Sequence, residues 1–105
     1  MPLDPGTVHR FAMLERAVKG QVKQGRYDES LKLVEELLSI APADAGLSKL
    51  KVRFAADLIK QAAMHQKIEA ATRIVQLVDT LVSPDHLGDQ EKQLLARAKK
   101  DLYSL

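Results

Sequence analysis

The chain has no cysteine and no tryptophan among its 105 residues, and its only aromatic side chains are Phe11, Tyr27, Phe54 and Tyr103. Without cysteine there is no disulfide, no thiolate metal site and no cysteine nucleophile, which fits a reducing compartment. Because the four aromatic residues are widely spaced, they predict no platform on which nucleic-acid bases would stack.

An excess of one charge and long apolar runs are lacking as well. Sixteen Lys and Arg residues against 14 Asp and Glu residues give a net charge of +2, too small to argue for nucleic acid. No run approaches the ~20 apolar residues of a membrane-spanning helix, and the N-terminal stretch MPLDPGTVHR lacks the layout of a signal peptide. We therefore expect a cytoplasmic protein that does not act at membranes.

Glycine and proline are few and, apart from Gly20, are confined to the ends and joints of the chain. Between the joints, apolar residues recur three and four positions apart, which indicates amphipathic helices, and no segment alternates with the period of a strand. The sequence therefore predicts an all-α fold with helices over 8–24, 27–40, 44–65, 67–82 and 89–103. We expect Thr7 to cap the first helix, and Val8 and Leu50 to face the core from the first and third helices.

One predicted joint, MHQKIEAA, contains neither glycine nor proline, so a single helix over 44–82 is the alternative there.

Shifting the sequence along itself places the second predicted helix pair on the first, with Val34 on Val75 and Leu37 on Val78. This repeat shift, a period of about 41 residues, is typical of stacked helical hairpins. We expect one domain with a flexible N-terminus (1–6), two hairpins (7–42 and 44–82) and a terminal helix (89–103).

The stretch QGRYDESLKLVEELLSIAP resembles the second half of a tetratricopeptide repeat. In that family a glycine and an aromatic residue make the turn, Asp-Glu and a small residue open the second helix, and proline ends the unit. Gly25, Tyr27, Asp28, Glu29, Ser30, Val34 and Pro42 occupy those places. The resemblance implies stacked hairpins that act as a protein-binding scaffold without enzymatic activity or a cofactor.

The first predicted helix departs from the family pattern, since Ala17-Val18 stands where Leu-Gly is usual and Gln21 where Tyr is usual. The repeat shift is also longer than the period of that family, which is about 34 residues. The residues of the family's chaperone-binding clamp are not matched, because Glu15, Lys19 and Asp57 stand in their places. The turn also looks like that of microtubule-interacting-and-transport domains, but the length and helix count argue against that relationship.

No residue pattern predicts catalysis or metal binding. His9, His65 and His86 show no second ligand at helical spacing within one element, and no phosphate-binding loop, nucleophile elbow or dinucleotide motif is present. We therefore expect no enzyme and no metal site.

Charge suggests a binding surface instead. The first and third predicted helices are basic, the third through the surface charges Lys49, Lys51, Arg53 and Lys60. In stacked hairpins these helices line the concave face. We therefore predict a groove for an acidic peptide or protein partner, lined by Lys19, Lys23, Arg53 and Lys60.

Ordinary solvated charges would explain the same pattern without a groove. A nucleic-acid-binding domain and an end fragment of a longer helical array are the competing interpretations. We expect the terminal helix to cap the stack, with contact to another subunit in a homo-oligomer as the alternative.

Overall fold

The computed structural model describes residues 3–105, which form five α-helices and one short 3-10 turn, with no strand among them. The predicted all-α fold is confirmed. The helices are α1 (Pro5–Lys23), α2 (Tyr27–Leu38), α3 (Ala45–Met64), α4 (Ile68–Leu81) and α5 (Asp89–Tyr103), and the turn η1 (Pro84–His86) precedes α5.

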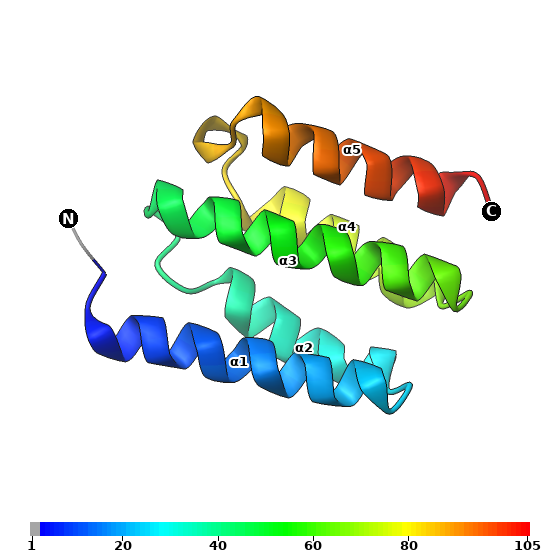
Figure 1. Ribbon diagram of the computed structural model, residues 1–105, viewed down its shortest axis with the longest axis horizontal. Coiled ribbons are helices and arrows are strands. Elements are labelled where there is room, and N and C mark those ends of the chain that lie inside the picture. The colour runs from blue at the N-terminus through cyan, green and yellow to red at the C-terminus, as the bar shows by residue number, and fades with distance from the viewer. Residues whose placement is uncertain (1–2) are drawn as a thin grey trace.

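The helices form two layers, with α1, α3 and α5 in one and α2 and α4 behind them (Figure 1). Helix α1 pairs with α2, α3 pairs with α4, and the two hairpins stack through α2 and α4. Helix α5 packs along α3 at the end of the stack. The fold is therefore two stacked antiparallel hairpins with a terminal capping helix, as the sequence predicts.

The two hairpin turns, which the repeat shift places on each other, have the same backbone geometry. In the first turn, the amide of Gly25 donates to Val22 at 2.9 Å and that of Arg26 to Gln21 at 2.9 Å. In the second, Gln66 donates to Ala63 at 3.0 Å and Lys67 to Ala62 at 2.7 Å. Both patterns are Schellman motifs, in which a residue with positive φ ends the helix.

Glycine adopts that positive φ in the first turn, whereas glutamine does so in the second. The φ angles are 77° at Gly25 and 59° at Gln66. The break between α3 and α4 therefore lies where the sequence predicts it, and the alternative of one helix over 44–82 is wrong. In this motif two carbonyls at the end of α3 accept hydrogen bonds, and these bonds stabilise the turn although Gln66 carries a side chain.

Aspartate caps the first helix of each hairpin. An Asp4 carboxylate oxygen accepts from the amide of Thr7 at 2.9 Å, and one of Asp44 accepts from that of Leu47 at 2.7 Å. The predicted cap at Thr7 is therefore wrong, because Asp4 precedes Pro5, which suits the first helical position. Of the predicted flexible segment 1–6, residues 1 and 2 lie outside the described residues, and Pro5 and Gly6 are helical.

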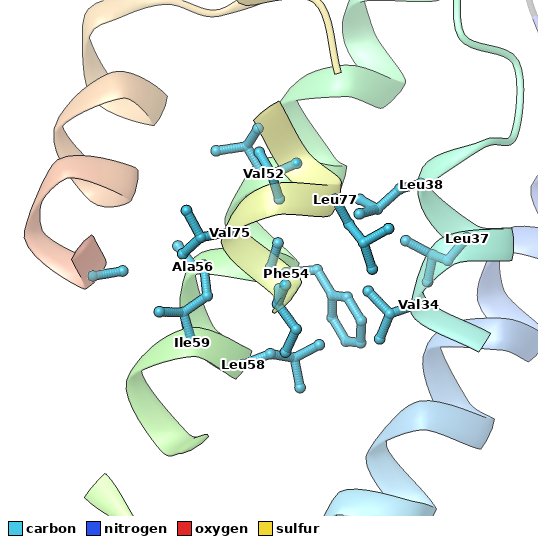
Figure 2. Close-up of a cluster of buried hydrophobic side chains, with 14 of the residues drawn as sticks. Val34, Leu37, Leu38, Val52, Phe54, Ala56, Leu58, Ile59, Val75 and Leu77 are labelled. Carbon is cyan, nitrogen blue, oxygen red and sulfur yellow. The ribbon is translucent and has the colours of Figure 1, made fainter. Parts of the chain in front are cut away.

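The two helices that join the hairpins, α2 and α4, bury small and aliphatic residues. Ser30 on α2 and Ala71 on α4 are fully buried, and the Ser30 hydroxyl donates to the carbonyl of Tyr27 at 2.7 Å. Small side chains let two helix backbones approach closely. Around them pack Val34, Leu37, Val75, Val78 and other buried residues, some of which Figure 2 shows.

Lys51 on α3 is fully buried, although the sequence counts it among the surface charges of its helix. Its Nζ donates to the carbonyl of Ile40, which lies just beyond the end of α2. Burial lowers the pKa of Lys51, and the nearby Asp44 carboxylate opposes that shift. Lys51 therefore ties the start of the second hairpin to the end of the first.

The terminal helix buries one side and exposes the other. Leu95, Ala98 and Leu102 are buried, whereas Lys92, Arg97 and other polar residues of α5 face the solvent. This pattern suits a helix that ends a stack. Among residues 3–105 no helix has the length and hydropathy that crossing a membrane requires.

Candidate functional site

A groove runs between α1 and α3, the two first helices of the hairpins. It consists of a cavity of about 590 Å³ near the hairpin turns and one of about 420 Å³ toward the helix starts. Phe54 and Asp57 line both cavities, so the two form one continuous surface, which we call the α1–α3 groove. The groove is open because α1 packs closely against α2, and α3 packs against α4 and α5.

The end of the groove near the helix starts is apolar. It is lined by Val8, Phe11 and Ala12 of α1 and by Leu50 and Phe54 of α3. Val8 and Leu50 are each 51% exposed, although the sequence predicts both to face the core. That prediction is wrong because their helices stand apart there, so the two side chains face the groove and not a neighbouring helix.

The end of the groove near the turns is basic. Lys19 and Lys23 of α1, with Lys67 from the second turn, line the larger cavity, and Asp57 is its only carboxylate among the described residues. None of the three lysines has an ion-pair partner within residues 3–105. The ammonium groups therefore remain available to a carboxylate or phosphate of a ligand.

Phe54 connects the two ends. Its side chain belongs to the cluster of buried side chains of α2 and α3 in Figure 2, and the residue is 9% exposed. The Lys19 Nζ lies 5.8 Å from the centroid of the ring, within reach of a cation–π interaction. A charge on Lys19 and an apolar contact at Phe54 are therefore neighbours in the groove.

Of the four residues predicted to line a basic groove, the structure brings Lys19 and Lys23 together at its basic end. Arg53 lines the apolar end instead. Lys60 is half-buried and lines neither cavity, although the repeat shift makes it equivalent to Lys19. The equivalence fails because Lys60 lies on α3, which has α5 on one side, whereas α1 has no such neighbour.

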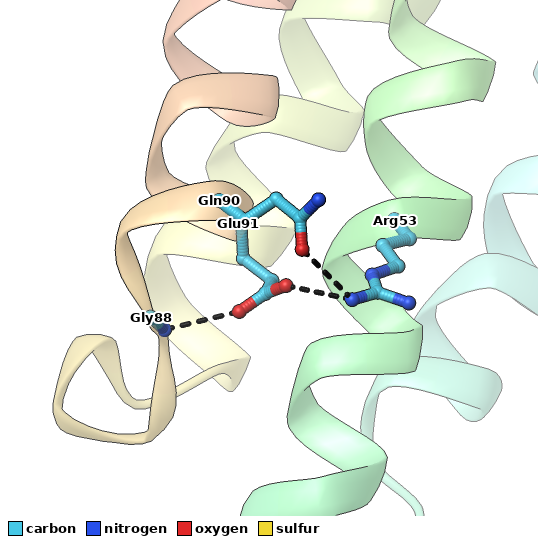
Figure 3. Close-up of polar contacts among 4 residues, drawn as sticks. All are labelled: Arg53, Gly88, Gln90 and Glu91. Carbon is cyan, nitrogen blue, oxygen red and sulfur yellow. Dashed lines mark hydrogen bonds and ion pairs between the residues drawn. The ribbon is translucent and has the colours of Figure 1, made fainter.

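Arg53 is engaged with α5, as Figure 3 shows. Its guanidinium donates to Glu91 at 3.0 Å and to Gln90 at 3.4 Å, and the second Glu91 oxygen accepts from the Gly88 amide at 3.1 Å. The hydrogen bond from Arg53 is the main reason that the pKa of Glu91 is lowered. Arg53 therefore fastens the start of α5 to α3 and is less available to a ligand than the lysines.

Most residues of the basic end were not predicted from the sequence, among them two from the second turn and one from the start of α2. Lys67 and His65 line it from the second turn, and Tyr27 lies beneath it at the start of α2. The Tyr27 and His65 ring centroids are 6.3 Å apart, and burial raises the pKa of Tyr27. The repeat shift was the signal that could have identified Lys67. It makes the turn that contains Lys67 equivalent to the turn of the first hairpin, and equivalent turns lie side by side in stacked hairpins.

The described histidines and carboxylates do not gather into a metal-binding cluster. Residues 3–105 contain no group of three His, Asp or Glu side chains that could hold a metal ion. The His86 Nδ1 lies 2.9 Å from the Ser48 hydroxyl, but Ser48 is 1% exposed and also contacts the carbonyl of Asp44. This pair therefore connects η1 to α3 and presents no accessible nucleophile.

Comparisons with protein-family models, with curated proteins and with solved structures found no match for this chain.

Proposed function

We propose that the chain is a non-enzymatic protein-interaction module with tetratricopeptide-like hairpins, whose α1–α3 groove binds an acidic segment of a partner protein. The observation that carries this proposal is that half-exposed apolar side chains and three unpaired lysines open onto one groove. The absence of cysteine supports a cytoplasmic location for it.

Affinity would come from the apolar end of the groove. Completing the burial of Val8 and of Leu50 contributes about 1 kcal/mol each, since each is already half covered. Charge at the other end adds selectivity, because Lys19, Lys23 and Lys67 attract carboxylates and disfavour basic segments. The groove therefore suits a partner segment that is both apolar and acidic.

Two carboxylates in the groove argue against nucleic acid as the ligand. Glu15 lies near its apolar end and Asp57 lies along both cavities, where they would repel a phosphate backbone. The nucleic-acid interpretation still makes a distinct prediction, namely affinity that falls steeply with salt. Titration with single-stranded DNA and RNA at two salt concentrations would reveal it.

A selection from a library of random peptides displayed on phage, each long enough to form about four helical turns, tests the proposal. We expect the recovered peptides to be enriched in Asp or Glu together with Leu or Phe. The variant Lys19→Glu/Lys23→Glu should bind them about tenfold more weakly, through lost attraction and new repulsion. The matched control is Lys92→Glu/Lys100→Glu, which changes the net charge equally on the exposed face of α5.

A second pair of variants tests the apolar end. Val8 and Met13 lie on the same helix and are 51% and 49% exposed, but only Val8 lines the groove. Val8→Ala should weaken the binding of the recovered peptides, and Met13→Ala should leave it unchanged. Recovery of no peptides, or binding that is indifferent to both the charge-reversed and the Val8 variants, would refute the proposal.

A further inference from the structure

We infer that the partner segment in the α1–α3 groove is an amphipathic α-helix, antiparallel to α1 and α3, with carboxylates in its first turn and apolar side chains after them. This inference rests on the proposed function and specifies the partner. Its carboxylates lie at Lys19, Lys23 and Lys67, and its apolar side chains lie toward Val8 and Leu50.

The walls of the groove favour a helix over an extended peptide. Both walls are α-helices, whose central backbone groups are bonded within the helix, and residues 3–105 contain no strand edge. An extended segment on the apolar end would turn some of its backbone N–H and C=O groups toward side chains that offer them no partner, which is unfavourable. A helix satisfies those groups internally and offers side chains alone, which is how helices bind grooves.

The length of the groove matches a helix of about four turns. On the α1 side the lining residues run from Val8 near the start of the helix to Lys23 at its end. At a rise of about 1.5 Å per residue this stretch is about 22 Å long. A partner helix of about 15 residues, which has the same length, therefore contacts both the basic and the apolar end.

The charges at the groove's ends set the direction of the bound helix. Both α1 and α3 end at the basic end, at Lys23 and Met64, where their terminal carbonyls carry partial negative charge. An antiparallel helix places its partially positive N-terminus there. Carboxylates in the first turn of that helix are favourable for the helix itself and also lie near the three lysines.

The contact between Lys19 and Phe54 sets the spacing of the partner's side chains. Because the Lys19 Nζ is 5.8 Å from the ring centroid, one carboxylate and one apolar side chain must reach neighbouring points. Residues three or four apart on a helix lie about 5–6 Å from each other, which fits this separation. We expect an acidic residue of the first turn to be followed three or four positions later by a large apolar residue.

The experiment uses the full chain and the tightest peptide recovered in the selection described above. Circular dichroism of the mixture, compared with the separate components, reports whether the peptide gains helix on binding. A proline placed at the centre of the peptide should weaken binding at least tenfold if it is helical. A spin label at either end of the peptide, with NMR of the protein, reports its direction.

The expected result is a gain of helix, binding weakened at least tenfold by proline, and broadening by the N-terminal label of resonances from Lys23 and Lys67. Broadening of Val8 and Leu50 by that label would show the opposite direction and overturn the inference. Binding without helix gain, unaffected by proline, would overturn it in favour of an extended peptide. In both cases the proposed function stands if Lys19→Glu/Lys23→Glu weakens binding about tenfold as expected, whereas recovery of no peptide refutes the function and the inference together.

Discussion

Helices α1 and α3 occupy the same place in their hairpins and have 19 and 20 residues, yet they are buried to very different extents. Helix α1 buries only Phe11 and Val18, whereas α3 buries eleven residues. The cause is the number of neighbours, because α3 packs against α4 and α5 while α1 packs closely against α2 alone. An amphipathic pattern therefore indicates which side of a helix faces the core, and the neighbouring helices decide how deeply it is buried.

The test with the largest expected effect truncates one buried residue in each helix, at positions that the repeat shift makes equivalent. Ile59 on α3 and Val18 on α1 are both fully buried. We expect Ile59→Ala to lower the free energy of unfolding by about 3–4 kcal/mol, and Val18→Ala by about 1.5–2.5 kcal/mol. Denaturation by urea measures both, and equal losses would contradict the view that α1 is the more weakly held helix.

A second test truncates long basic side chains at another equivalent pair, Lys51 and Arg10. Lys51 is buried against the carbonyl of Ile40, whereas Arg10 is exposed. Lys51→Ala should cost about 2–4 kcal/mol, because it leaves a cavity and an unpaired carbonyl, and Arg10→Ala should change stability by less than about 0.5 kcal/mol.

Lys51→Met separates the packing of the stem from the charge. Methionine refills most of the space and removes the cost of burying an ammonium group, so its loss should be smaller than that of alanine. If the methionine variant is the less stable of the two, the hydrogen bond to Ile40 matters more than the volume of the stem. The same urea titration decides this.

The two turns give a third test, smaller in size. Gly25→Ala should cost about 1–2 kcal/mol, since the positive φ of 77° is strained for alanine while space for its Cβ is open. Gln66→Gly should instead stabilise the chain by about 0.5–1 kcal/mol, the relief at positive φ exceeding the entropy that glycine loses on folding. Thermal denaturation of the two variants should therefore shift in opposite directions, and a loss in both would contradict the equivalence of the turns.

The smallest expected change in stability concerns Glu91, on the side of α3 that α5 covers. Because the pKa of Glu91 is lowered below its ordinary value of 4.5, its stabilising contribution is complete above pH 4.5 and is lost as pH falls through the lowered pKa. Glu91→Gln should therefore be less stable than the wild type at neutral pH, and the difference should shrink below pH 4.5. A difference that does not depend on pH would show that the Arg53 contact adds nothing through charge.

The sequence predicts the number and order of the helices because apolar spacing and joints act locally. Positive φ at Gln66 could not be predicted, since the hydrogen bonds that stabilise it belong to the folded turn. Burial of Lys51 was missed because its stem packs while its amine finds the carbonyl of Ile40, in a different part of the chain.

The site could be predicted only in part. Charge spacing located Lys19 and Lys23, which line the groove, but could not show that Lys60 lies outside it. Exposure of Val8 and Leu50 depends on a gap between two helices that are far apart in the sequence. Helical periodicity carries no information on that gap.

The shallow burial of α1 has a consequence for motion as well as for stability. A helix with few buried contacts opens at a lower free energy than the whole domain, so its amide hydrogens exchange with solvent sooner than those of α3. We therefore expect the α1 wall of the α1–α3 groove to open more often than the α3 wall. A ligand seated between the two walls would slow exchange in α1 most, which makes the less stable helix the more sensitive reporter of occupancy.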